Sequence, residues 1–110
     1  MARIKQETSE TVRPKSKNEL KIIIQNTIKK KGIKCDLNFI DTSLIKNLSY
    51  LFRKVDFNGN ISKWDVSNVK NMQGMFEKSK FNGDISQWDV SNVTDMSGMF
   101  RDSMFMLLIP

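Results

Sequence analysis

Apolar positions in the chain follow two different spacings, and the change from one to the other is repeated. In residues 61–66, Trp64 and Val66 alternate with Asp65, which is the period of a β-strand. From Val69 onward the apolar residues follow at intervals of three, three and one, which predicts a turn or two of α- or 3₁₀-helix over 69–76. The pattern therefore predicts a unit made of a strand, a short helical segment and two turns.

The same pattern returns after 24 residues. Residues 57–80 read FNGNISKWDVSNVKNMQGMFEKSK and residues 81–104 read FNGDISQWDVSNVTDMSGMF followed by RDSM, with identity at 16 of the 24 positions. Residues 33–56 form a divergent third version in which the apolar register is kept, with Ile33 over Phe57. We call residues 33–56, 57–80 and 81–104 copies 1, 2 and 3. Self-similarity at this period predicts units that stack to share one core.

Within each copy, particular residue types indicate particular roles. The register of Trp64 and Trp88 beside Val66 and Val90 predicts that both indoles are buried. The methionines are expected in the core with the phenylalanines, at Met72, Met75, Met96 and Met99. Gly59 and Gly83 follow Phe-Asn and are expected in a return turn with positive φ, whereas Gly74 and Gly98 are expected to allow close stacking. Asn58 and Asn82 predict an internal ladder that satisfies turn backbone.

A helix is predicted before the copies. Ser16 and Glu19 have the spacing of a capping box, and Gly32 is a typical helix terminator. Between them the apolar residues fall on one stripe, namely Leu20, Ile23, Ile24 and Ile28. The expected organisation is a flexible basic arm over 1–15, a capping helix over 16–32, the three copies, and an aberrant apolar tail over 105–110.

The frame of apolar residues in 61–79, and the nearly complete string at 81–100, resemble the bacterial BspA-like leucine-rich repeats in their mycoplasma-type variant. The resemblance covers residues 33–104. It implies a short leucine-rich-repeat solenoid with a small parallel β-ladder, capped by the N-terminal helix. It also implies a family whose members are mostly surface proteins, adhesins or proteins of unknown function.

Charge is unevenly distributed, because residues 1–34 hold ten Lys/Arg and three Glu whereas residues 35–110 hold eight Lys/Arg and nine Asp/Glu. Candidate contacts for an anion such as nucleic acid are Lys29, Lys30, Lys31 and Lys34. No aromatic residues interleave with these lysines, so nucleic acid is the weaker expectation. The polar N-terminus lacks the pattern of a signal peptide and no membrane partner is expected, which predicts a cytoplasmic protein. The alternative is a surface location, as a fragment of a longer family member.

Composition argues against catalysis. The chain has no histidine and a single cysteine, so the common Ser-His, Cys-His and metal-His sites are excluded. Cys35 aligns with Gly59 in a turn, without an evident activating base. A calcium loop at 56–67 fails, because Ile61 and Ser67 stand where glycine and glutamate are needed. We therefore expect no enzyme, no metal and no cofactor.

The outward residues of the predicted strands are the candidate partner-binding face. They form the pairs Phe39 and Asp41, Lys63 and Asp65, and Gln87 and Asp89. The aspartates recur at the repeat period, which favours a structural role in holding turns, whereas the other position differs between copies. The sequence therefore predicts a non-catalytic protein-protein interaction module, such as a small inhibitor or adaptor. The alternatives are a fragment of a surface adhesin array and a nucleic-acid-associated protein.

The polar turn expected after copy 3 is replaced by apolar residues. The open end of the array and this tail provide a candidate end face, made of Met96, Met99, Phe100, Phe105, Leu107, Leu108 and Ile109. Three alternatives follow from this pattern: the tail folds back as a cap, two chains meet in a symmetric homodimer, or the sequence is a truncated gene product.

Overall fold

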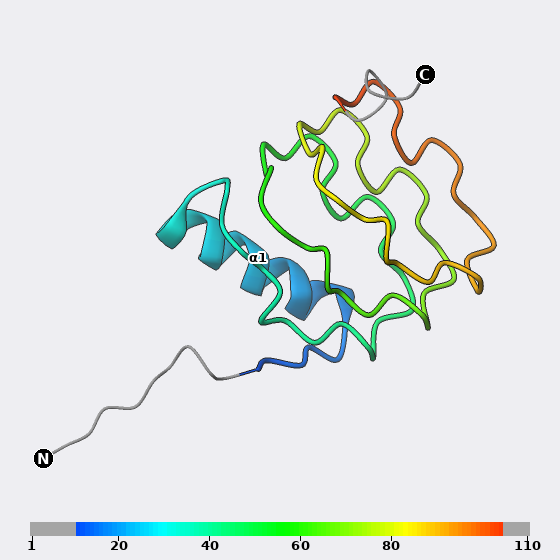
Figure 1. The fold of residues 1–110 in the computed structure, drawn as a ribbon, viewed down its shortest axis with the longest axis horizontal. Helices are drawn as coiled ribbons and strands as arrows, with labels where there is room; N and C mark the ends of the chain where they lie inside the picture. Colours follow the sequence, from blue (N-terminus) through cyan, green and yellow to red (C-terminus); the bar gives the residue numbers. More distant parts are fainter. Residues whose placement is uncertain (1–10, 105–110) are drawn as a thin grey trace, which may run out of the picture.

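A computed structural model describes residues 11–104 of the chain (Figure 1). Its helix, α1 (Lys17–Lys31), begins at the predicted cap, where Ser16 Oγ accepts a hydrogen bond from the Glu19 amide at 3.2 Å. It ends at Gly32, which has a φ of 95° and donates its N–H to the Ile28 carbonyl at 2.7 Å. The predicted helix is confirmed, with one difference in its cap: the Glu19 carboxylate accepts from the Lys15 amide.

The helix covers copy 1. Leu20 and Ile24 are buried in the same core as the copies, and α1 lies beside the first turns of the chain in Figure 1. At the start of α1, Lys17 Nζ donates to both the carbonyl oxygen and the hydroxyl of Ser49, at 2.9 and 3.0 Å. Just before the helix, Val12 exchanges main-chain hydrogen bonds with Phe39 and Asp41. One side of copy 1 is therefore closed by residues that precede it in the sequence.

The predicted solenoid with a parallel β-ladder is wrong. Within residues 11–104 there is no sheet, and parallel pairing is limited to isolated bridges: Val12 with Ile40, Asp36 with Asn60, Asn47 with Asn71, and Asn71 with Asp95. The chain instead forms a compact arrangement of turns whose successive copies run side by side (Figure 1). The physical reason is that a turn follows each bridge within a residue or two, so no extended run becomes long enough to be a strand.

Copy 2 shows how both predicted elements are replaced by turns. In place of the strand, the Trp64 amide returns to the Ile61 carbonyl and the Val69 amide to the Val66 carbonyl. In place of the helical segment, the amides of Met75, Glu77 and Ser79 each donate to the carbonyl three residues earlier. The intervening amides point out of the copy, so the i→i−4 pattern of a helix cannot form.

These intervening amides join neighbouring copies, and we call them the junction amides. Those of copy 1 donate to carbonyls of copy 2 at 2.8–2.9 Å: Leu48 to Asn71, Tyr50 to Gln73, Phe52 to Met75, and Lys54 to Glu77. Those of copy 2 donate to carbonyls of copy 3 at 2.8–3.0 Å: Met72 to Asp95, Gly74 to Ser97, Phe76 to Met99, and Lys78 to Arg101. Each copy is therefore bonded to the next through the same set of main-chain atoms.

Aromatic side chains form the centre of the core. Phe52, Phe76 and Phe100 stack with centroid distances of 5.6 and 5.5 Å and nearly parallel rings. The predicted burial of Trp64 and Trp88 is confirmed, and their Nε1 atoms donate to carbonyls of the preceding copy, those of Leu37 and Ile61. Two apolar residues expected in the core are instead exposed, Ile33 by 46% and Val90 by 36%.

The glycines have roles other than those predicted. Positive φ angles occur at Gly74 and Gly98, whereas Gly59 and Gly83 do not have them. Gly59 is needed for close approach, because a Cβ there would collide with the carbonyl oxygen of Cys35. At Gly74 a Cβ would also meet the ring of Tyr50, so this position combines the close stacking that we predicted with a left-handed turn.

Candidate functional site

The three aspartates of the predicted binding face hold turns. Asp41, Asp65 and Asp89 each accept, through Oδ1, a hydrogen bond from the amide of the serine two residues later, at 2.9, 3.0 and 3.0 Å. This arrangement is an Asx turn, in which the side chain substitutes for a backbone acceptor. The predicted structural role of these aspartates is confirmed. Their Oδ2 atoms remain available for a second interaction at Asp65 and Asp89, whose hydroxyl contacts also use Oδ1.

Asp41 differs from the other two because it also forms an ion pair. Its Oδ2 lies 2.9 Å from Arg13 Nε, and its side chain is only 22% exposed. Hydrogen bonds from Ser43 lower the pKa of Asp41, and the Arg13 guanidinium adds to this effect. The serine at the corresponding position likewise lowers the pKa of Asp89. Asp41 is therefore engaged with the segment before α1, whereas Asp89 keeps an exposed carboxylate.

The variable positions of the predicted face are not equivalent. Lys63 and Gln87 are exposed, whereas Phe39 is half-buried and packs against the core. The main chain beneath Lys63 is fixed, because its amide donates to Asn38 Oδ1 at 2.8 Å. The structure therefore leaves four exposed members of the predicted face, which we call the side row: Lys63, Asp65, Gln87 and Asp89.

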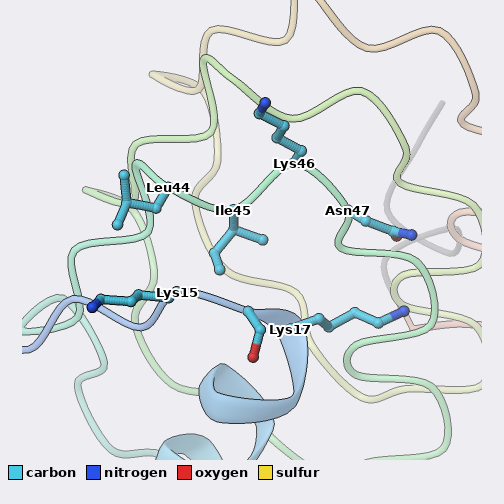
Figure 2. Close-up of a pocket in the computed structure, with 7 residues that line it drawn as sticks. Lys15, Lys17, Leu44, Ile45, Lys46 and Asn47 are labelled. Atoms are coloured by element: carbon cyan, nitrogen blue, oxygen red, sulfur yellow. The ribbon is translucent and has the colours of Figure 1, made fainter.

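Two small hollows flank α1. The first, of about 250 Å³, is lined by Lys15, Ser16, Lys17, Leu44, Ile45, Lys46 and Asn47. Its three lysines run in different directions and their amines do not converge (Figure 2). The second, of about 230 Å³, lies between α1 and copy 1 and includes Ile24, Ile28, Tyr50, Phe52 and Arg53. Neither hollow brings together an acid, a base and a nucleophile, so neither has the composition of a hydrolytic active site.

Other reactive side chains are dispersed or buried. Cys35 is buried, and burial raises the pKa of its thiol, which opposes formation of the nucleophilic thiolate. Among residues 11–104, no cluster of three or more Asp, Glu or Cys side chains could hold a metal ion. The candidate anion contacts Lys29, Lys30, Lys31 and Lys34 are exposed at the C-terminal end of α1, and none of them forms an ion pair within the described part of the chain.

The predicted end face is only partly apolar surface. Met96 is 42% exposed, whereas Met99 is buried and Phe100 is half-buried within the phenylalanine stack. The exposed Val90 belongs to the same end, although it was expected in the core. The remaining members, Phe105, Leu107, Leu108 and Ile109, lie outside the described residues.

Sequence reasoning missed several columns of residues that recur every 24 positions. Asx turns also form at two further corners of each copy, in the columns Asp36, Asn60, Asp84 and Asn47, Asn71, Asp95. Glu77, which is buried, bridges Arg53 of copy 1 at 2.9 Å and Arg101 of copy 3 at 3.8 Å. An asparagine ladder exists at Asn68 and Asn92, whose Nδ2 atoms donate to carbonyls of the preceding copy.

The predicted ladder at Asn58 and Asn82 is present as one contact, from the Asn82 amide to Asn58 Oδ1, and its members are half-buried and exposed instead of internal. The signal that could have revealed the missed columns is simple. An Asp or Asn recurs at the repeat period, two residues before the amide that it accepts from.

Comparison with known proteins gives a family but no function. Within the described residues, no helix is long and apolar enough to cross a membrane. No curated protein and no solved structure matches the chain. Residues 20–106 match the family described as "Mycoplasma protein of unknown function, DUF285". Because this match spans most of the sequence, the chain belongs to that family.

Proposed function

We propose that the protein is a non-catalytic protein-protein interaction module that contacts its partner through the side row. One observation carries the proposal: the main chain is held in the same way in copies 2 and 3, while Lys63 and Gln87 differ and are exposed. A repeated scaffold with variable outward side chains is how repeat proteins vary their specificity. The likeness of residues 33–104 to BspA-like repeats, many of which are adhesive, supports the same class of function.

The side row alternates lysine or glutamine with carboxylates that are already fixed by their own turns. Asp65 and Asp89 lose little conformational freedom when a partner binds, because Oδ1 of each is held by the following serine. Their free Oδ2 atoms suit the cationic side chains of a protein partner. A small inhibitor or adaptor is the concrete form that we favour, and a fragment of an adhesin array is the alternative.

Site-specific photo-crosslinking in the native host tests this proposal. A photoreactive residue at position 63 or 87 should yield adducts with the same protein, whereas one at exposed Asn26 on α1 should not. The substitution Lys63→Glu should abolish the adduct formed from position 87. Lys80→Glu is the matched control, because Lys80 is an exposed lysine of the same copy outside the side row.

Three results would refute the proposal: no adduct at either position, equal adducts at all three positions, or insensitivity to Lys63→Glu. Adducts removed by nuclease, with retention that falls steeply as salt is raised, would instead favour the nucleic-acid alternative through Lys29, Lys30, Lys31 and Lys34.

A further inference from the structure

The junction between copies 2 and 3 shows what one face of a copy binds. Four junction amides of copy 2 donate to carbonyl oxygens of copy 3. At the same junction the side chains of Val66 and Met72 are covered, with exposures of 1% and 0%. The natural ligand of this face is therefore another copy of the repeat, placed in the same orientation.

Copy 3 presents the same face without that ligand. The junction amides of Met96, Gly98 and Asp102 have no acceptor among residues 11–104. The side chains that correspond to Val66 and Met72 are Val90 and Met96, which are identical in type but 36% and 42% exposed. An edge of unpaired amides beside exposed apolar side chains is a template for pairing with another chain.

We propose that this open end docks another protein that carries an uncapped copy of the same 24-residue repeat. The partner would supply carbonyl oxygens equivalent to those of Asp95, Ser97 and Arg101, which accept the corresponding amides of copy 2. Its apolar side chains would cover Val90 and Met96. The proposal concerns a different surface from the side row, so either one can fail without the other.

A second molecule of this chain does not fit the open end in either orientation. Placed head to tail, it would have to offer the Ser49 carbonyl, which is the equivalent of the Gln73 and Ser97 carbonyls that accept junction amides. That carbonyl is already occupied by Lys17 Nζ at 2.9 Å, and α1 covers the surface around it. Placed tail to tail, two molecules would set donor row against donor row.

The experiment uses wild-type protein as the receptor and an uncapped variant of the full chain as the probe. The substitutions Lys17→Glu and Leu20→Asp remove the contact to Ser49 and place a charge in the buried seat of α1. Light scattering coupled to size exclusion should show that wild-type protein alone is monomeric at micromolar concentration. A mixture of wild-type protein and probe should contain a complex with one molecule of each.

Two exposed methionines of copy 3 provide a matched pair of receptor variants. Met96→Asp should weaken the complex by about tenfold or more, because the equivalent Met72 is fully buried at the internal junction. Met104→Asp should change the affinity by less than about twofold, because Met104 is similarly exposed but its equivalent, Lys80, remains exposed at that junction. Equal effects of the two substitutions would contradict the proposed docking face.

Other occupants of the open end give different results. A folded probe that does not bind wild-type protein overturns the proposal, as does a wild-type homodimer that Met96→Asp dissociates. If the probe does not fold, a synthetic peptide of residues 81–104 replaces it, and amide hydrogen exchange of the wild-type protein is the readout. The Met96 and Gly98 amides should exchange faster than those of Met72 and Gly74 and should become protected when the peptide is added.

Failure of the peptide to protect these amides would overturn the proposal. Equal protection of all four amides before any addition would also overturn it, because a segment of the same chain, such as residues 105–110, would then occupy the end.

Discussion

Copies 2 and 3 share two thirds of their residues, yet the same residue types have different surroundings in the two copies. Met72 and Val66 are fully covered, whereas Met96 and Val90 are more than one-third exposed. Gly74 lies under the ring of Tyr50, whereas a Cβ at Gly98 would meet nothing within 4 Å. Burial in this protein is therefore a property of the junction and not of the local sequence. Substitutions at equivalent positions of the two copies test this conclusion directly.

The largest difference is expected for the phenylalanine stack. Phe76 lies between Phe52 and Phe100 and also contacts Phe81 and Trp88, with no exposed surface. Phe76→Ala should lower the free energy of unfolding by about 3–5 kcal/mol. Phe100→Ala should cost clearly less, because Phe100 is half-buried. Urea unfolding followed by tryptophan fluorescence measures both, and equal losses would refute the comparison.

The methionines provide the next test. Met72→Ala should cost about 2–5 kcal/mol, because it leaves a cavity at a closed junction. Met96→Ala should change the free energy of unfolding by less than about 0.5 kcal/mol, as is usual for exposed side chains. The measurement is again urea unfolding, on monomeric protein. A loss of more than 2 kcal/mol at Met96, in the range of core substitutions, would mean that the open end is covered in solution.

The glycines should differ less. At Gly98, alanine meets only the strain of a φ of 64°, which costs about 1–2 kcal/mol. At Gly74, alanine should cost about 1 kcal/mol more, because the Tyr50 ring must also move. The additional substitution Tyr50→Ala should remove this excess at Gly74 and leave the cost at Gly98 unchanged. Thermal unfolding of the four variants tests the coupling, and its absence would show that the ring does not restrict Gly74.

The smallest effect concerns acid stability and compares Asp41 with Asp89. Hydrogen bonds from the following serine lower the pKa of both carboxyls, and Arg13 assists only at Asp41. A pKa that is lower in the folded chain means that the ionised carboxylate favours folding. This stabilisation is complete above the unfolded value and is lost as the pH falls through the lower folded value.

Asp41→Asn should therefore flatten the fall in unfolding free energy below about pH 4, and Asp89→Asn should flatten it less. Because asparagine keeps the Oδ1 acceptor, both variants retain the turn. At neutral pH, Asp41→Asn should cost no more than about 1 kcal/mol, as expected for an exposed ion pair. Urea unfolding at a series of pH values gives the slopes, and a steeper slope for Asp41→Asn would contradict the assignment.

Apolar spacing was sufficient to predict α1 and most of the core, because a side chain that recurs every 24 residues beside other apolar side chains has to be covered. It failed for the strand and the helical segment. Trp64-Asp65-Val66 alternates over only three residues, which is as compatible with a turn that ends in a bridge as with a strand. The apolar spacing from Val69 is also satisfied by turns whose alternate amides leave the copy.

The candidate site was less accessible to sequence reasoning. The pairing of Arg13 with Asp41 depends on how the segment before α1 returns to copy 1, and no local pattern encodes this path. The exposure of Val90 has the same origin, because an identical residue 24 positions earlier is buried. Recurrence shows which residues are equivalent, but it does not show which end of the stack is left open.

The Asx corners have a consequence for how such proteins can change in length. Each corner acceptor serves an amide two residues further on in its own copy, and three columns of corners follow this rule. Deleting or duplicating one complete 24-residue segment would therefore break no corner and would require no compensating substitution elsewhere. Gene rearrangements in whole units should yield folded products far more often than insertions of any other length.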